Sequence, residues 1–232
     1  MPPDPVARPE LVRQPYSPAD VKFMAGMIPH HAQAVVMTGW APTRDASPQL
    51  QLMCERMLIS QRDEIAFMRT WLRDRGQFVP AADATHGKME HDGMTHDMLM
   101  PGMLNEAEMA ALEKARGKEF DRLFLIGMIK HHQGAIGMVE ELFASYGAAQ
   151  DDFVYLFAAD IQADQATEID RMQQMLEALV LRFAMAVTYS GVEAPGPPGA
   201  RRENAGCIRP TSNAAGRDAS AAECDRHCEA EY

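Results

Sequence analysis

Apolar side chains recur at helical spacing along most of the chain, and Pro, Gly and Ser separate the helices that this pattern predicts. Ser17 and Ser47 each precede a proline, an order that suits a helix N-cap followed by the first helical position. Pro29 lies inside the first predicted helix, where the loss of a backbone donor predicts a kink. The pattern predicts a short helix over 105–116 and four longer helices over residues 17–40, 47–75, 117–147 and 151–189.

These four long helices form two pairs of similar sequence. Residues 23–31 read Phe-Met-x-x-Met-Ile-Pro-His-His, and residues 124–132 read Phe-Leu-x-x-Met-Ile-Lys-His-His. The helices that follow them share Gln-x-x-Glu-Ile-x-x-Met, at residues 61–68 and 165–172. Two matching helical hairpins are what a four-helix bundle requires. The sequence therefore predicts an all-α, four-helix bundle built from two duplicated helical hairpins.

Imidazole and thioether groups share one face of each His-containing helix. A helix turns by about 100° per residue, so the donors of each copy fall within roughly 140° of one another. Both donor types suit Cu(I) and, less selectively, Cu(II) or Zn, whereas the scarcity of carboxylates argues against Ca or Mg. Adjacent histidines diverge by about 100°, so one of each pair can ligate while the other orients it or faces solvent. The donors are Met27, His30, His31, Met37, Met128, His131, His132 and Met138.

The same residues also allow a simpler interpretation. A stripe of Met, Phe and Ile at helical spacing is most often core, and a single histidine there is usually a hydrogen-bonded core residue. A pair of adjacent histidines in each of the two motifs favours a metal role, because each buried imidazole needs a hydrogen-bond or metal partner. Glu64 and Glu168 are candidate auxiliary ligands or hydrogen-bond partners of the imidazoles. The alternative for Glu64 is a surface charge pair beside Arg62 and Asp63.

A His- and Met-rich segment over 77–104 joins the two hairpins. Its glycines and prolines argue against a packed helix, and its composition is typical of flexible metal-binding tracts. The alternatives are a solvated linker and a set of exposed thioethers open to oxidation. The candidate ligands in this segment are His86, Met89, His91, Met94 and His96.

Composition narrows the class of partner. The net charge of −11 argues against a nucleic-acid partner, and no apolar run is long enough to span a membrane. No secretory signal is visible at the start of the chain. Residues 1–16 are expected to form an extended arm, residues 17–189 the bundle, and residues 191–232 a disordered tail. In the tail, Cys207, Cys224 and Cys228 are open to metal binding, to disulfide formation or to no role.

The paired Phe-x-x-x-Met-Ile-x-His-His segments closely resemble the domain of unknown function 305 family, over about residues 17–180. The resemblance implies a ferritin-like four-helix bundle, and some members of this family are extracytoplasmic copper-binding proteins linked to copper tolerance. By position, it implies copper binding by the same eight Met and His residues of the two motifs. It also implies a periplasmic or otherwise extracytoplasmic location.

We therefore expect a non-catalytic protein that captures or buffers copper, as Cu(I) or Cu(II), with another soft or borderline ion as the alternative. A metal-exchange protein is the expected partner, and the sequence leaves the oligomeric state open. The first alternative is a di-iron oxidoreductase, which would require Glu-x-x-His motifs that the four helices lack. The second is a structural bundle whose histidines sense pH. Signatures of a nucleophile elbow, a phosphate-binding loop or a zinc protease are absent from the sequence.

Overall fold

The computed structural model describes residues 15–85, 87–91 and 94–190, without the side chains of 87–98 and 182–190. The prediction of an all-α protein is confirmed, with one short β-hairpin in the segment that joins the two halves. The tail over 191–232 and most of the arm over 1–16 lie outside the described residues. The elements are α1 (Pro18–Trp40), a 3₁₀ turn (Ala41–Thr43), α2 (Pro48–Asp74), β1 (Gly87–His91), β2 (Met94–Met98), α3 (Glu106–Lys114), α4 (Gly117–Ala144) and α5 (Asp152–Ser190).

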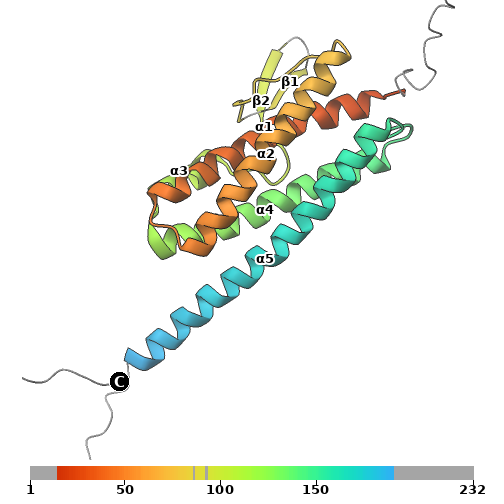
Figure 1. Ribbon diagram of the computed structural model, residues 1–232. Coiled ribbons are helices and arrows are strands. Elements are labelled where there is room, and N and C mark those ends of the chain that lie inside the picture. The colour runs from red at the N-terminus through yellow and green to blue at the C-terminus, as the bar shows by residue number, and fades with distance from the viewer. Residues whose placement is uncertain (1–14, 86, 92–93, 191–232) are drawn as a thin grey trace, which may run out of the picture. The chain divides into compact units, whose positions relative to one another are not determined.

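Two antiparallel helical hairpins make up the bundle (Figure 1). α2 packs along α1, α5 packs along α4, and the two hairpins meet through α1 and α4. The antiparallel hairpin β1–β2 pairs Gly87 with Met98 and His91 with Met94, where the sequence predicted irregular chain. Among the described residues, no helix is both long enough and apolar enough to cross a membrane.

The first helix begins where the sequence predicted. The Ser17 hydroxyl accepts a hydrogen bond from the Asp20 backbone N–H, and the Asp20 carboxylate accepts one from the Ser17 N–H at 2.6 Å. This reciprocal pair satisfies two donors that a helix start otherwise leaves free. Ser47 differs, because its side chain makes no capping bond and its backbone N–H donates to Asp121 in α4 instead. α1 continues as a helix through Pro29.

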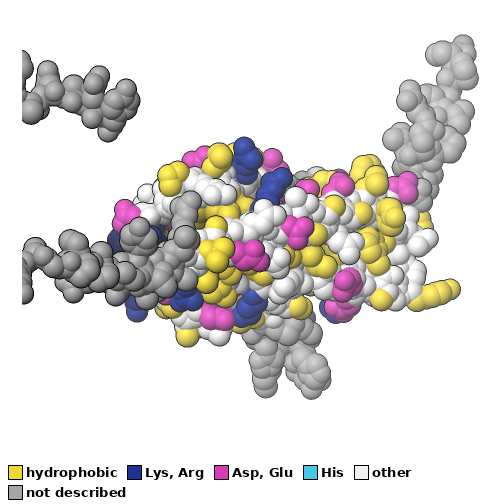
Figure 2. Space-filling view, turned by 90° about the horizontal axis from the view of Figure 1, so that it is seen from below, with side chains coloured by type: hydrophobic (Ala, Val, Ile, Leu, Met, Phe, Trp, Pro, Cys, Tyr) yellow, Lys and Arg dark blue, Asp and Glu magenta, His cyan; other side chains and the backbone are white. Residues whose placement is uncertain are grey.

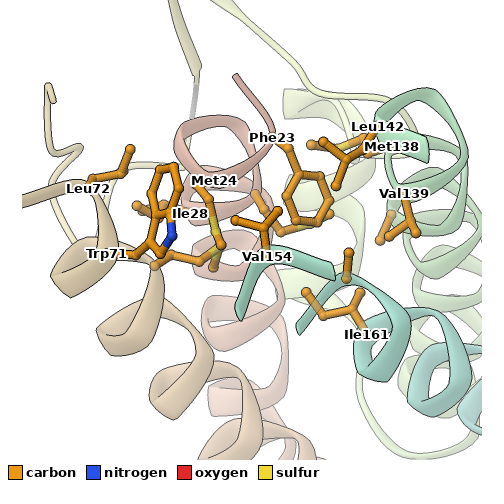
Figure 3. Packing of buried hydrophobic residues seen from close by; sticks show 14 of the residues in the cluster. Phe23, Met24, Ile28, Trp71, Leu72, Met138, Val139, Leu142, Val154 and Ile161 are labelled. Atoms are coloured by element: carbon orange, nitrogen blue, oxygen red, sulfur yellow. The ribbon is translucent and has the colours of Figure 1, made fainter. Parts of the chain in front are cut away.

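The buried apolar residues form two clusters, and the buried histidines lie where one cluster gives way to the other. The first takes its residues from 23–32 of α1, 65–72 of α2, 135–142 of α4 and 154–161 of α5 (Figure 3). The second takes its residues from 34–37 of α1, 50–57 of α2, 120–128 of α4 and 169–172 of α5. Each of the four long helices thus has one apolar section in each cluster, with buried histidine or glutamine side chains near the boundary between the two sections.

Cys54 lies in the second cluster as a free, buried thiol. Burial is the main reason that its pKa rises to about 12, and the carboxylates of Asp121 and Glu55 add to the effect. At pH 8 a thiol with this pKa holds about a thousandfold less thiolate than an ordinary one, and thiolate is the reactive form. We expect Cys54 to react with a disulfide reagent about a thousandfold faster after unfolding in urea than in the native protein.

The measurement requires a variant in which Cys207, Cys224 and Cys228 are replaced by Ser, so that Cys54 supplies the whole signal. A native reaction rate close to the unfolded rate would contradict the buried placement of Cys54.

Candidate metal site

The four histidines of the two motifs form a row through the interior of the bundle. The rings of His30 and His131 stack across the α1–α4 contact, with centroids 3.8 Å apart. His31 lies 6.2 Å from His30 at one end, and His132 lies 6.1 Å from His131 at the other. All four residues are 0 % exposed, which excludes the expectation that one of each pair faces solvent. The face of the molecule in Figure 2 accordingly shows no histidine among the described residues.

Hydrogen bonds assign the ring proton of each histidine. His30 Nε2 lies 3.1 Å from the Pro101 carbonyl oxygen, and His131 Nε2 lies 3.0 Å from the His30 carbonyl oxygen. A carbonyl oxygen can only accept, so each Nε2 carries a proton and donates it. The Nε2 atoms of His31 and His132 face the carboxylates of Glu64 and Glu168 at 2.5 and 2.6 Å. In a neutral ring with Nε2 protonated, Nδ1 carries a lone pair, and none of the four buried Nδ1 atoms has a hydrogen-bond partner among the described residues.

Glu64 and Glu168 therefore contact the imidazoles, as one of the two sequence interpretations predicted. Glu64 is not the surface charge pair of the other interpretation. One of its oxygens accepts from His31 and the other accepts from the Ser60 hydroxyl at 2.9 Å. Burial opposes ionisation of Glu64, but the hydrogen bond and charge of His31, together with the hydrogen bond from Ser60, outweigh it and hold the Glu64 pKa below the usual value. A role for either carboxylate as a direct metal ligand stays a prediction.

The two central imidazoles are held in the neutral form. Burial and then the charge of His31 lower the pKa of His30, the bond to Pro101 opposes the shift, and the resulting pKa is about 3. The pKa of His131 also lies well below the usual value, first through burial and then through the charge of His30. A neutral imidazole is the form that binds a metal ion, so no proton has to leave these two rings before an ion arrives.

The thioethers of the two motifs are divided between the two apolar clusters, and each cluster contains one of them from each half. Met27 and Met138 belong to the first apolar cluster, and Met37 and Met128 belong to the second. An added Cβ at Gly26 would lie 3.3 Å from the Met138 methyl carbon, and one at Gly127 would lie 3.6 Å from the Met37 methyl carbon. The glycine before Met27 and the glycine before Met128 thus leave room for the partner thioether. Sequence periodicity alone places these donors on one face of their own helix. It does not show that each cluster combines thioethers from both halves.

The loop over 99–104 is the part of the site that sequence reasoning missed. Its Pro101 carbonyl positions His30, and the backbone of Leu104 exchanges two hydrogen bonds with the buried amide of Gln33, at 2.7 and 2.9 Å. The loop can lie this close because Gly134 of α4 has no side chain: a Cβ there would lie 2.0 Å from the Pro101 oxygen. The sequence shows Gly134 in the second motif, but it does not show that the loop at Pro101 packs against it.

Within the described residues, no three His, Cys, Asp or Glu side chains are placed to hold one ion together. The four imidazoles are spread along a row, so they supply donors singly or in pairs, and thioethers would have to complete any site. The predicted ligands His86, Met89, His91, Met94 and His96 have no described side chains and remain predictions.

A comparison with protein families agrees with the geometry. The chain matches the family described as "Domain of unknown function (DUF305)" over residues 20–226. The chain belongs to the DUF305 family. The match runs past residue 180, where the sequence resemblance was expected to end, and covers most of the tail.

Solved DUF305 relatives have the same helical fold. A crystallised DUF305 fragment from Deinococcus radiodurans is 27% identical, with a TM-score of 0.58 over 71% of this chain and 99% of that one. The protein CopM in its Cu(II)-bound form is 28% identical, with a TM-score of 0.53 over 68% of this chain and 96% of that one. CopM has also been solved in Cu(I)-bound, Ag-bound and apo forms. An uncharacterized protein, L153, of Acanthamoeba polyphaga mimivirus is 36% identical over 56 residues, which are 24% of this chain and 37% of that protein.

Proposed function

We propose that this DUF305 protein captures and buffers copper without catalysing a reaction, taking Cu(I) at the row of four imidazoles. The observation that carries the proposal is the set of four buried Nδ1 atoms, to which no described residue supplies a hydrogen-bond partner. A buried polar atom left without a partner costs about 1–3 kcal/mol. A cation bound at these lone pairs would remove that cost, which is a physical reason for the chain to keep them.

The donor chemistry supports a soft ion. Imidazole nitrogen and thioether sulfur together suit Cu(I), and the Met pairs flank the row on the same helices. The carboxylates of Glu64 and Glu168 are each bonded to a ring Nε2, the arrangement in which a second group orients a metal-binding histidine. The copper- and silver-bound forms of CopM, a relative of the same fold, point to the same class of ion.

The alternatives gain no support from the described residues. A di-iron centre needs converging carboxylates, and no three His, Cys, Asp or Glu side chains converge there. An extracytoplasmic location and a metal-exchange partner protein belong to the proposal as corollaries of copper handling.

An anaerobic Cu(I) titration against a colorimetric competitor tests the proposal. We expect wild type to take up Cu(I) tightly, and a variant with His30, His31, His131 and His132 replaced by Asn to lose its tightest site. Asn keeps a polar atom in place of Nδ1 and creates less empty space than Ala. The change should weaken the tightest binding by about a hundredfold or more, since several ligands are lost.

The matched control replaces His86, His91 and His96 by Asn, because these histidines belong to the joining segment. The proposal expects the tightest Cu(I) site to survive in this control. Unchanged binding in the four-histidine variant, together with loss in the control, would move the site to the joining segment. Circular dichroism and urea unfolding establish that both variants fold.

A further inference from the structure

The helices α2 and α5 belong to different hairpins. Each packs mainly on its own hairpin partner, and side chains join the two helices, with the ring centroids of Phe67 and Phe157 4.6 Å apart. A cleft of about 220 Å³ lies between them, with Gln61 and Glu64 on one wall and Asp164, Gln165 and Glu168 on the other. Ser60 and Thr167 add hydroxyl oxygens to the lining, which also contains the guanidinium groups of Arg56 and Arg171.

Two buried amides of this cleft lack partners. Gln61 and Gln165 occupy matching positions in the two halves, and each residue is 3 % exposed. Neither Oε1 atom accepts a hydrogen bond from any described residue. An amide oxygen so deeply buried normally has a donor or a cation beside it, because leaving it unpaired costs stability. Both glutamines line the same cleft, so a single bound group could satisfy both amide oxygens.

The charged side chains that line the cleft favour a hydrated cation. Glu64, Asp164 and Glu168 supply three negative charges and Arg56 and Arg171 two positive ones, which leaves a net lining charge of −1. The two arginines also line an adjoining cleft, so they lie towards one end of this one. Burial and the charges of Glu64 and Glu168 raise the pKa of Asp164, which indicates carboxylates facing one another without full compensation.

The ligand type follows from these donors. Carboxylate, amide and hydroxyl oxygens suit hard divalent cations, which often bind through retained water. Water-mediated binding also fits the finding that, among the described residues, no three His, Cys, Asp or Glu side chains converge on one point.

We propose that the α2–α5 cleft binds a hydrated divalent cation between the amides of Gln61 and Gln165 and the surrounding carboxylates. Glu64 and Glu168 each reach both environments, since they line the cleft and also bond to His31 and His132. The cleft is therefore the site at which an incoming hydrated ion halts before it exchanges water for imidazole. This second role rests on the proposed copper function, whereas the cation site does not.

Manganese(II) is the probe for the site itself, because it is hydrated, paramagnetic and a poor match for thioethers. In NMR spectra of the full chain, low Mn(II) should broaden the amide signals of residues 60–64 and 164–168 first. Replacing Gln61 and Gln165 by Leu should weaken this binding by about tenfold, since oxygen contacts to a charge are lost. Wild-type broadening that is absent or centred elsewhere would overturn the site.

Matched controls separate this site from general acidity. Gln174→Leu changes an exposed glutamine of the adjoining cleft, and Glu177→Gln removes an exposed acidic residue of α5 outside the cleft lining. Both controls should leave Mn(II) broadening unchanged, whereas Asp164→Asn should weaken it. Equal weakening by Glu177→Gln and Asp164→Asn would show diffuse attraction to an acidic surface and overturn the proposal.

Stopped-flow uptake of Cu(II) tests the second role. The Gln61→Leu, Gln165→Leu variant should acquire Cu(II) about tenfold more slowly than wild type, with the same final stoichiometry. Wild-type uptake rates in this variant would overturn the role of the cleft as an access site. Localised Mn(II) binding without uptake of either Cu(I) or Cu(II) would support the cation site while contradicting the proposed copper function.

Discussion

Metal-free protein is expected to lose stability steeply as the pH falls from about 6.5 towards 3. In the unfolded chain the His30 imidazole titrates near its ordinary pKa of 6.5, whereas in the folded protein its pKa is about 3. Below pH 6.5 the unfolded state therefore binds a proton that the native state refuses, and the free energy of unfolding decreases. Above pH 6.5 neither state is protonated and this contribution is constant.

The size of the effect follows from the shift. Each such imidazole costs about 1.4 kcal/mol per pH unit within the window, so His30 alone removes roughly 5 kcal/mol by pH 3. His131, whose pKa is also lowered, adds to the slope. A domain is typically stable by about 5–15 kcal/mol, so acid should unfold the metal-free protein.

Urea unfolding between pH 5 and 6.5, with a chelator present, measures this slope. The range lies above the pKa of Glu64, which is held below its usual value, so that carboxylate does not contribute. We expect His131→Asn to reduce the slope by up to about 1.4 kcal/mol per pH unit. An identical slope in wild type and variant would show that His131 is not a source of the acid sensitivity.

Replacing Gly134 by Ala is expected to destabilise the protein by about 3 kcal/mol, near the upper end of the usual cost of overpacking. The new Cβ would lie 2.0 Å from the Pro101 oxygen and 2.6 Å from Gly102 Cα, and these are backbone atoms that cannot rotate away. Gly102 has a φ of +77°, and a Cβ there would lie 2.5 Å from the Lys130 oxygen, so the loop has little freedom to shift. The loop would have to leave α4, and the hydrogen bond from His30 to Pro101 would break.

Gly137→Ala is the matched control, because it lies one turn later on α4 with nothing within 4 Å of an added Cβ. It should stabilise the helix by about 0.5–1 kcal/mol, since Ala is the better helix former. Thermal or urea unfolding compares the two variants, and Cu(I) competition then measures the effect on the site. Equal stability of the two variants would mean that the loop does not lie on Gly134.

The sequence alone was sufficient to predict the helices and to single out the histidine pairs. These features are local in the sequence: they are the helical spacing of apolar residues, the Ser17–Asp20 capping pair and the repeated motif. Interactions between residues close in sequence are sufficient to predict them. The bounds of α1, α2, α3 and α5 therefore agree with the predicted ranges to within one or two residues, and α4 ends three residues early. The hairpin β1–β2 escaped prediction because its two strands are only five residues long and consist mostly of His, Met and charged residues instead of β-branched and aromatic ones.

The tertiary structure alone decided how the two halves share their donors. Three contacts join residues far apart in sequence. His30 stacks on His131 and donates a hydrogen bond to Pro101, and Met37 and Met138 each lie beside a glycine of the other half. Periodicity orients a side chain about its own helix axis but does not say which partner faces it. The unpartnered Nδ1 atoms and the α2–α5 cleft depend on that packing, so they became visible only in three dimensions.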